Sequence, residues 1–360
     1  MTGLSERHAE LVRLIEAQEV TRAAPPLLLS AAPYFELAGE EFGRSLLLTT
    51  TNDGVEYCLR PDFTLPIVEN YLAEGRSGSP AAFTYLGPIF RQIDSRPVEY
   101  QQAGLELLAQ PDPELALDQV LTFIRYALEI YDISDIRVRV GGVALFESLL
   151  AEAGVPLAWR GRIRHRFGHP EAMARLMERL AKPDAVAARP VENRATMVEI
   201  VTEAMIAAGL ALDGGRTADE IADRYLEKQA LSAAPVSPEL VRLLQSYLAI
   251  SAPAPEAFAM IAGLARQHDF SVDPALERAR RHLGALNALA PQVEVVFDAS
   301  FSPRLDYYTG LVFEVQGTGG AILASGGEYD RMLERLGATA PISASGCALW
   351  VERLERETAR

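Results

Sequence analysis

Apolar residues recur along the chain at two spacings, one typical of helices and one typical of strands. A spacing of three to four residues, with charged residues on the opposite face, predicts amphipathic helices. These helices are expected over 4–20, 63–72, 115–131, 255–268, 273–289, 328–336 and 349–357. Short runs rich in β-branched and aromatic residues predict strands. The strands are expected over 46–48, 55–59, 82–90, 100–108, 136–140, 293–298, 311–315 and 321–324.

Two glycine-containing turns indicate how neighbouring strands are joined. Asn52-Asp53-Gly54 separates the first pair of strands, and a segment with three glycines, 317–320, separates the last pair. Such turns are typical of antiparallel hairpins. Strands and helices alternate too rarely for a doubly wound parallel sheet. We therefore predict an α+β fold in which helices pack on one face of an antiparallel sheet.

The region 154–251 differs from the rest because nearly all of its patterns are helical. Pro170 and Pro238 stand where first-turn prolines belong, and Thr217 with Glu220 forms a capping-box pair. We predict a core made of residues 1–153 and 252–360, interrupted by a mainly helical insertion over 154–251.

The composition excludes several classes of protein. The 360 residues carry 34 basic and 49 acidic side chains, a net charge of -15, which disfavours non-specific nucleic-acid binding. Cys58 and Cys347 stand alone, so we expect neither a disulfide framework nor a metal site, and a reducing, cytoplasmic location. No secretory segment or long apolar run is found, so no membrane span is expected. We expect no cofactor.

The segment 59–64, Leu-Arg-Pro-Asp-Phe-Thr, places an acid and a hydroxyl two residues apart at a turn from strand to helix. There, Asp62 and Thr64 can point into one site and hold an ammonium group through charge-assisted hydrogen bonds. The alternative interpretation is a helix cap, because Asp and Thr are good N-cap residues.

Two predicted strands carry further polar candidates. Arg91 ends the first, where a guanidinium can bind a carboxylate with two hydrogen bonds; the alternative is a solvated arginine. Gln102, Gly104 and Glu106 share one face of the second strand, since side chains alternate with period two. The glycine is expected to leave room for a ligand, and the glutamate can meet an imidazole or an amine. The alternative is an outward polar face.

Tyrosines beside glycines form the last group of candidates. Tyr307 and Tyr308 precede Gly310, and Tyr329 follows Gly326 and Gly327. Such side chains make apolar walls with a polar tip, which suit a flat ring, although aromatic residues in strands also serve simply as core.

Taken together and in this order, these segments resemble the catalytic core of class II histidyl-tRNA synthetases, from about residue 4 to 354. The family's Leu-Arg-Pro-Glu-Gly-Thr matches 59–64, its motif 2 arginine matches Arg91, and the end of its motif 3 matches Glu352-Arg353. Its glutamine and glutamate match Gln102 and Glu106. Its histidine-specific tyrosines match Tyr308 and Tyr329, and Pro26 matches the motif 1 proline of the dimer interface.

Several departures concern catalysis. The family's catalytic arginine is Pro303 here, with Arg304 one position later and therefore expected on the opposite face. The motif 3 glycine beside the adenine is Trp350, whose indole is expected to fill part of the ATP site. The motif 2 loop shortens to 94–98, Glu328 replaces an arginine, and no anticodon-binding domain is expected.

A chain that keeps the binding residues and lacks the catalytic arginine resembles a known paralogue of histidyl-tRNA synthetase. That paralogue serves as the regulatory subunit of ATP phosphoribosyltransferase. That resemblance implies a non-catalytic chain, a self-dimer and a hetero-octamer with the short-form catalytic subunit. It implies feedback by L-histidine in the first step of histidine biosynthesis, and no tRNA ligand. The alternatives are a synthetase paralogue that activates an amino acid for another acceptor, and a free histidine-binding module.

The resemblance also assigns roles to residues. Asp62 and Thr64 would hold the α-amino group of histidine, and Arg91 and Gln102 its carboxylate side. The imidazole would be read by the remaining residues of the site: Glu106, Tyr307, Tyr308 and Tyr329.

A separate group of arginines surrounds His165 in the predicted insertion. It comprises Arg160, Arg162, Arg164 and Arg166, which form either a docking patch for an acidic partner or a solvated helix face.

Overall fold

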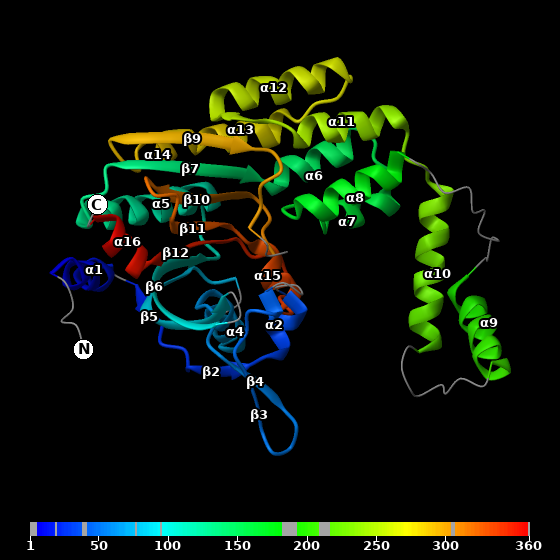
Figure 1. Ribbon diagram of the computed structural model, residues 1–360, viewed down its shortest axis with the longest axis horizontal. Coiled ribbons are helices and arrows are strands. Elements are labelled where there is room, and N and C mark those ends of the chain that lie inside the picture. The colour runs from blue at the N-terminus through cyan, green and yellow to red at the C-terminus, as the bar shows by residue number, and fades with distance from the viewer. Residues whose placement is uncertain are drawn as a thin grey trace. The chain divides into compact units, whose positions relative to one another are not determined.

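The computed structural model divides the chain into two compact units, one formed by residues 1–148 and 248–360 and the other by residues 149–247. The second unit covers nearly the same stretch as the predicted insertion. Figure 1 shows the elements of both units. The structure describes residues 6–18, 20–37, 42–75, 78–93, 96–181, 193–208, 217–303 and 307–358.

Within these residues, the first unit is built on a nine-stranded sheet, which confirms the α+β fold. Only β1 with β5 and β7 with β9 pair in parallel; the other neighbours are antiparallel. In spatial order the strands are β1 (Thr21–Arg22), β5 (Ala81–Ile93), β6 (Arg96–Leu108), β12 (Ala344–Trp350), β11 (Ile322–Glu328), β10 (Leu311–Gly317), β7 (Asp135–Gly142), β9 (Gln292–Asp298) and β8 (Ser251–Pro253).

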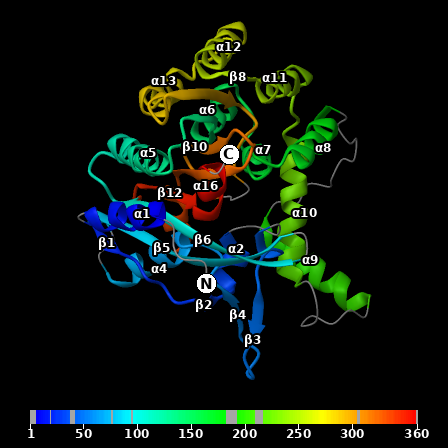
Figure 2. The ribbon, with the colours of Figure 1, turned by 60° about the vertical axis from the view of Figure 1, so that its left-hand side comes forward.

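A second, three-stranded sheet has the order β2 (Leu28–Ser30), β4 (Glu56–Leu59) and β3 (Leu48–Thr50). The predicted hairpin around Asn52-Asp53-Gly54 is therefore confirmed. Gly54 has a φ of 85°, which an L side chain rarely adopts. The β3–β4 hairpin extends away from the rest of its unit in both ribbon views (Figure 1 and Figure 2).

Helices lie on both faces of the large sheet, so the prediction of a single covered face was wrong. One face packs against α5 (Pro113–Ile130), α12 (Ala254–Gln267) and α14 (Leu283–Asn287). On the opposite face, α4 (Thr64–Ala73) buries Leu65, Val68 and Tyr71 against a cluster that includes Tyr85 and Trp350. The other helices of the unit are α1 (Glu6–Ala17), α2 (Ala32–Leu37), α13 (Asp273–Arg281), α15 (Asp330–Arg335) and α16 (Val351–Thr358).

The secondary-structure elements described in the second unit are helices, joined by turns. The capping box of Thr217 and Glu220 is present, with both reciprocal hydrogen bonds made. The helices of this unit are α7 (Leu157–Arg164), α8 (Pro170–Ala181), α9 (Arg194–Ala207) and α10 (Ala218–Ala233). Two helices, α6 (Val143–Glu152) and α11 (Pro238–Leu248), run across the division between the units.

The strand β12 is absent from the sequence prediction, which placed only a helix at 349–357. Its residues, Ala-Ser-Gly-Cys-Ala-Leu-Trp, lack the β-branched side chains that mark strands. They are small because a central strand packs on both faces. At Gly346 an added Cβ would lie 1.6 Å from the Glu106 carboxylate.

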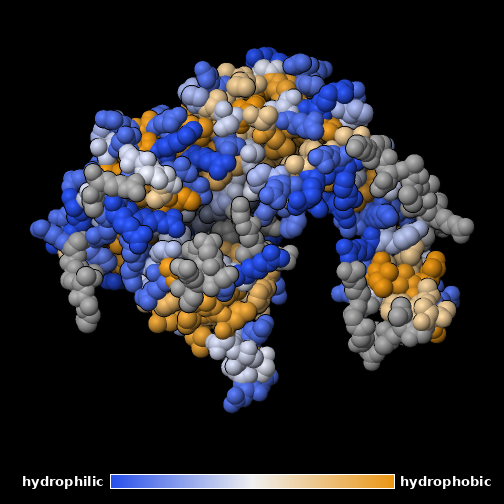
Figure 3. Space-filling model, in the orientation of Figure 1, coloured by the Kyte–Doolittle hydropathy of each residue, from blue (hydrophilic) through white to orange (hydrophobic). Residues whose placement is uncertain are grey.

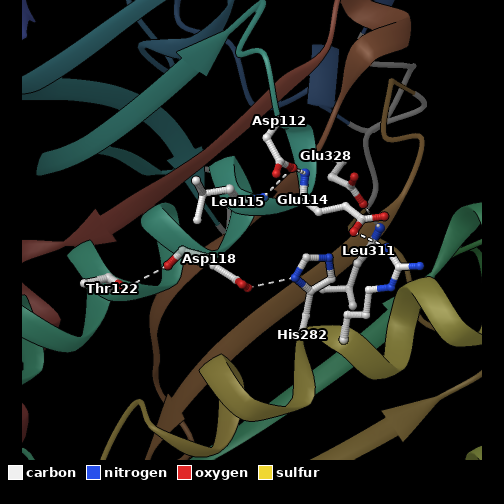
Figure 4. A network of polar contacts seen from close by, with 9 residues as sticks. Asp112, Glu114, Leu115, Asp118, Thr122, His282, Leu311 and Glu328 are labelled. Carbon is white, nitrogen blue, oxygen red and sulfur yellow. Dashed lines mark hydrogen bonds and ion pairs between the residues drawn. The ribbon is translucent and has the colours of Figure 1, made fainter.

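Glu328 belongs to a polar network on the α5 side of the sheet (Figure 4). Its Oε2 accepts a hydrogen bond of 2.7 Å from the Leu311 amide, so this carboxylate faces α5. Nearby, Nδ1 of His282 lies 2.8 Å from Oδ1 of Asp118, and Arg281 pairs with Glu114. Burial raises the pKa of Glu328, and the Leu311 amide opposes that rise. Glu328 therefore holds strand ends together.

Gly104 provides a test of the packing between β6 and the strands beside it. An added Cβ would lie 2.2 Å from the Cys347 carbonyl oxygen and 2.3 Å from the Tyr85 ring. We expect Gly104→Ala to lower the free energy of unfolding by about 1–3 kcal/mol in urea titrations. The control is Gly284→Ala in α14, where nothing lies within 4 Å of the added carbon. An equal loss in both variants would contradict this packing.

Candidate functional site

The candidate site lies on the face of the large sheet that carries α4. Strand register sets Glu106 beside Gly346, Gly104 beside Ala348, and Gln102 beside Trp350. Because side chains alternate along a strand, Gln102, Gly104 and Glu106 share this face, as the sequence predicted. Tyr85 pairs with Gly104 from β5 and shares it too.

Glu106 is the centre of the site. Its side chain is buried, and its two oxygens accept hydrogen bonds from Thr64 Oγ1 at 2.6 Å and from the Tyr329 hydroxyl at 2.5 Å. The Tyr85 hydroxyl lies 3.5 Å from the same carboxylate and donates to the Cys347 carbonyl at 3.1 Å. Burial raises the pKa of Glu106 to about 8, although the hydroxyl donors favour the charged form.

Asp62 and Thr64 occupy different places within the site. Asp62 is buried, and its Oδ1 accepts a hydrogen bond of 3.2 Å from the Leu65 amide in the first turn of α4. Asp62 therefore stabilises the helix start from the residue before the N-cap, which is Phe63 and makes no side-chain cap bond. Burial raises the pKa of Asp62, and the nearby guanidinium of Arg91 opposes that rise. The Thr64 hydroxyl donates a hydrogen bond to Glu106. Thr64 therefore lies at the end of the site that we assigned to the imidazole of histidine.

Arg91 holds its place through a backbone acceptor and two rings. Its Nε donates to the Pro61 carbonyl at 2.9 Å, and its guanidinium lies 5.0 Å from the Phe42 ring and 5.2 Å from the Trp350 ring. Burial lowers the pKa of Arg91, and the carboxylate of Asp62 opposes that change. These contacts favour a fixed arginine over the alternative of a solvated one.

The indole of Trp350 lies close to two guanidinium groups. Arg91 lies 5.2 Å from its ring, Arg353 lies 4.3 Å from it, and the Tyr100 ring meets it edge-on at 5.4 Å. Trp350 is 8% exposed, so its indole packs against these three side chains rather than rotating into solvent.

The three predicted tyrosines come together. Tyr307 lies 5.0 Å from Tyr308 and 6.2 Å from Tyr329, measured between ring centroids. Tyr307 and Tyr329 are buried, and all three pack in the same cluster of apolar side chains. Arg304, with 305 and 306, lies outside the described residues, so its predicted orientation stays a prediction.

Three buried polar atoms of this region lack a hydrogen-bond partner within the described part of the chain. They are Oε1 of Gln102, Nε1 of Trp350 and the hydroxyl of Tyr34. A buried polar group without a partner costs about 1–3 kcal/mol, so such groups point to a polar ligand or ordered water. Gln102 and Trp350 are register neighbours.

The sequence reasoning missed Tyr85 and misread Gly104. We expected Gly104 to leave room for a ligand, but the Tyr85 ring occupies that space. Tyr85 also stacks on Phe63, with ring centroids 4.4 Å apart. Its even spacing from Arg91 along β5 places both side chains on the same face, which would have identified it.

The arginine group of α7 is largely engaged within its own unit. Arg160 donates to the Val155 and Ala151 carbonyls, Arg162 pairs with Glu227 at 2.7 Å, and Arg166 donates to the Arg162 carbonyl. Docking by these arginines, with Arg164, stays a prediction.

The described residues contain no group of three or more His, Cys, Asp or Glu side chains arranged to hold a metal ion. Among the same residues, no helix is both long and apolar enough to cross a membrane.

Comparisons with known proteins agree on one family. The model of the histidyl-tRNA synthetase family matches residues 5–188 and 184–354. The ATP phosphoribosyltransferase regulatory subunit of Agrobacterium fabrum is 33% identical over 366 residues, covering 99% of this chain and 97% of that protein.

Solved structures share the fold. An ATP phosphoribosyltransferase regulatory subunit/histidyl-tRNA synthetase from Bacillus halodurans matches with a TM-score of 0.62 and 20% identity, covering 98% of this chain and 78% of that one. The ATP phosphoribosyl transferase (HisG:HisZ) complex from Thermotoga maritima matches with a TM-score of 0.54 and 16% identity, covering 97% and 98%.

The buried carboxyl of Glu106 predicts a pH-dependent stability. Because its folded pKa is raised from 4.5 to about 8, the folded chain retains a proton that the unfolded chain releases between these values. The free energy of unfolding should therefore fall as pH rises through this window, by at most about 1.4 kcal/mol per pH unit. Glu106→Gln should remove this part of the slope in urea titrations at pH 5, 7 and 9.

The matched control is Glu294→Gln, because the Glu294 side chain is 60% exposed. It should keep the wild-type slope. Parallel stability curves for wild type and Glu106→Gln would show that Glu106 does not titrate in this range.

Proposed function

The chain belongs to the family of ATP phosphoribosyltransferase regulatory subunits, which share the histidyl-tRNA synthetase fold, and we propose that the cluster around Glu106 is its binding site for L-histidine. It is a non-catalytic regulatory subunit for histidine biosynthesis. The observation that carries the proposal is a buried carboxyl surrounded by hydroxyl groups and aromatic rings.

We propose that its partner is the short-form catalytic subunit of ATP phosphoribosyltransferase. The names of the relatives support this, as does the fold shared with the Thermotoga maritima complex. A hetero-octamer of four plus four chains, a cytoplasmic location and the lack of a tRNA ligand complete the proposal.

The chemistry of the Glu106 cluster suits an imidazole. An imidazole has an ordinary pKa near 6.5, and Glu106 has a pKa of about 8, so one proton can be shared between them near neutral pH. Thr64 and Tyr329 orient the carboxyl by donating to its two oxygens. Tyr307 and Tyr308 provide the apolar walls for the ring.

The polar end of histidine would lie toward Arg91. Its guanidinium suits the carboxylate, and the buried carboxyl of Asp62 suits the α-amino group. The unpartnered Oε1 of Gln102 is an acceptor, so it suits the ammonium group rather than the carboxylate side to which the resemblance assigned Gln102. We do not place Thr64 at the α-amino group, as the resemblance implied, because its hydroxyl donates a hydrogen bond to Glu106.

Trp350 supports a site for an amino acid without a nucleotide. Its indole packs beside the guanidinium groups of Arg91 and Arg353, where the flat ring of a nucleotide could otherwise stack. With Pro303 at the position of the synthetase arginine, the site retains groups that bind and lacks the charge that would stabilise amino-acid activation. Histidine then regulates by binding two states of the complex unequally.

The first test removes the central carboxyl. Glu106→Ala should weaken histidine binding by roughly 1–3 kcal/mol, because a charged hydrogen bond is lost from a buried site. Isothermal titration calorimetry of the purified chain measures this change. Glu294→Ala, at an exposed carboxylate on β9, should bind as the wild type does. Unchanged affinity in Glu106→Ala would remove the cluster from the proposal.

Reconstitution tests the regulatory role in the same set of variants. Mixing the chain with a short-form ATP phosphoribosyltransferase of the same organism should raise phosphoribosyl-ATP formation, and L-histidine should lower it. Glu106→Ala should still activate while responding less to histidine. If the chain neither binds nor alters the transferase, the proposed partner is wrong.

We also propose that the chain forms a self-dimer, and an apolar surface supports this. Exposed apolar side chains gather around the three-stranded sheet, where Figure 3 shows hydrophobic surface. Such clusters commonly mark interfaces between proteins. Its members, between 43% and 48% exposed, are Leu27, Leu28, Phe35, Leu48 and Val55.

Leu28→Asp should therefore convert a dimer to a monomer in sedimentation velocity experiments, because it places a charge in the apolar interface. Leu157→Asp is the control, since Leu157 is a single leucine, 81% exposed, on α7. A Leu28→Asp protein that sediments as the wild type does would place the interface elsewhere.

A further inference from the structure

The short segment Tyr308–Leu311 is attached to its surroundings at several backbone points. The Thr309 amide donates to the Glu328 carbonyl at 2.9 Å, and the Leu311 amide donates to the Glu328 carboxylate at 2.7 Å. The Asp330 amide donates to Thr309 Oγ1 at 3.2 Å. These bonds fix the segment against the end of β11 and the start of α15.

Two further attachments join this segment to α6. The Gly310 carbonyl accepts a hydrogen bond of 2.9 Å from the Val143 amide, at the first residue of α6. The Tyr308 carbonyl accepts a bond of 3.1 Å from Nη1 of Arg331, whose Nη2 donates to Oε1 of Glu147 at 2.8 Å. Val143 and Glu147 stand about one helical turn apart, so the segment follows one turn of α6.

Arg331 is suited to this bridge by its chemistry. Its guanidinium is a planar fork with several donors, so it can bond a carbonyl and a carboxylate in different directions at once. The Arg331 side chain is 15% exposed and that of Glu147 is 32% exposed, so solvent screens this pair less than a surface pair. A lysine keeps the charge and loses the fork.

The helix at the other end of the bridge leads out of the first unit. α6 begins directly after β7, and the division between the units falls within it, between Ser148 and Leu149. α6 is therefore the covalent path from the sheet into the helical unit, and Arg331 connects that path to the backbone of Tyr308.

We propose that Arg331 is a positioning residue that couples ligand occupancy at the tyrosine cluster to α6, and through α6 to the helical unit. This inference rests on the proposed function, because the ligand is L-histidine. An imidazole that packs on Tyr307 and Tyr308 shifts their backbone, and the Tyr308 carbonyl moves with it. The guanidinium transfers that shift to Glu147, while the Val143 bond holds the start of the helix.

The test compares binding with inhibition in three variants. Glu147→Gln and Arg331→Lys remove or weaken the bridge, and Arg137→Lys changes an exposed arginine of β7 whose side chain is 55% exposed. For each, calorimetry on the full chain gives the Kd for L-histidine, and the reconstituted transferase gives the histidine concentration for half inhibition. The ratio of the two measures coupling, apart from any change in affinity.

We expect Glu147→Gln to keep its Kd within about twofold while the ratio rises about fivefold or more, the lower range of allosteric coupling. Arg331→Lys should raise the ratio similarly and weaken binding by a few-fold, because the Tyr308 carbonyl loses a donor. Arg137→Lys should match the wild type. Hydrogen exchange over residues 143–152 should change on adding histidine to the wild type and not to Glu147→Gln.

A ratio that stays at the wild-type value in both bridge variants would overturn the inference, as would unchanged exchange in α6 of the wild type. The proposed function would still stand if the wild-type chain binds histidine and histidine inhibits the transferase reconstituted with it. If the wild type binds no histidine, the proposed function itself fails and this inference fails with it. Should Arg331→Lys fold poorly, the milder Glu147→Gln variant decides.

Discussion

The burial of one carboxyl group, Glu106, is the constraint on which the site depends. A carboxyl removed from water must find donors, and three elements provide or approach them: α4 through Thr64, β5 through Tyr85 and the end of β11 through Tyr329. Their hydroxyl groups meet at one carboxyl because α4, β5, β6 and β11 are packed in this arrangement. The neighbouring strand carries glycine at position 346 because any side chain there would collide with the carboxylate.

The same face shows how a synthetase-like fold can serve a regulatory purpose. The side chains proposed to bind histidine lie on the sheet, and the indole of Trp350 packs beside the guanidinium groups of Arg91 and Arg353. In the proposed function, a single side chain on β12 excludes a nucleotide without any change in the register of the sheet. On the α5 side, Glu328 bonds to the backbone of β10, so it holds strands together and leaves the ligand face unchanged.

Regulation further requires that the site be connected to something that moves. The segment that carries Tyr308 is hydrogen bonded on both sides, to the end of β11 and to α6. Such a segment transmits a displacement well, because few of its backbone groups are free to absorb it. In the proposed coupling, α6 is the covalent path that joins the tyrosine cluster to the helical unit.

The sequence by itself determined the fold class, the hairpins, the helical nature of the insertion and the family, because these depend on local periodicity, turn residues and ordered motifs. It also showed that 102, 104 and 106 share a face, since alternation along a strand is a local property. It did not reveal β12, whose residues are small because of packing against neighbours distant in sequence. Nor did it reveal the hydrogen bond between Thr64 and Glu106, which are 42 positions apart. Only the tertiary structure decided that Tyr85 fills the space over Gly104 and that Arg331 bridges Tyr308 to α6, because strand order and helix packing bring those groups together.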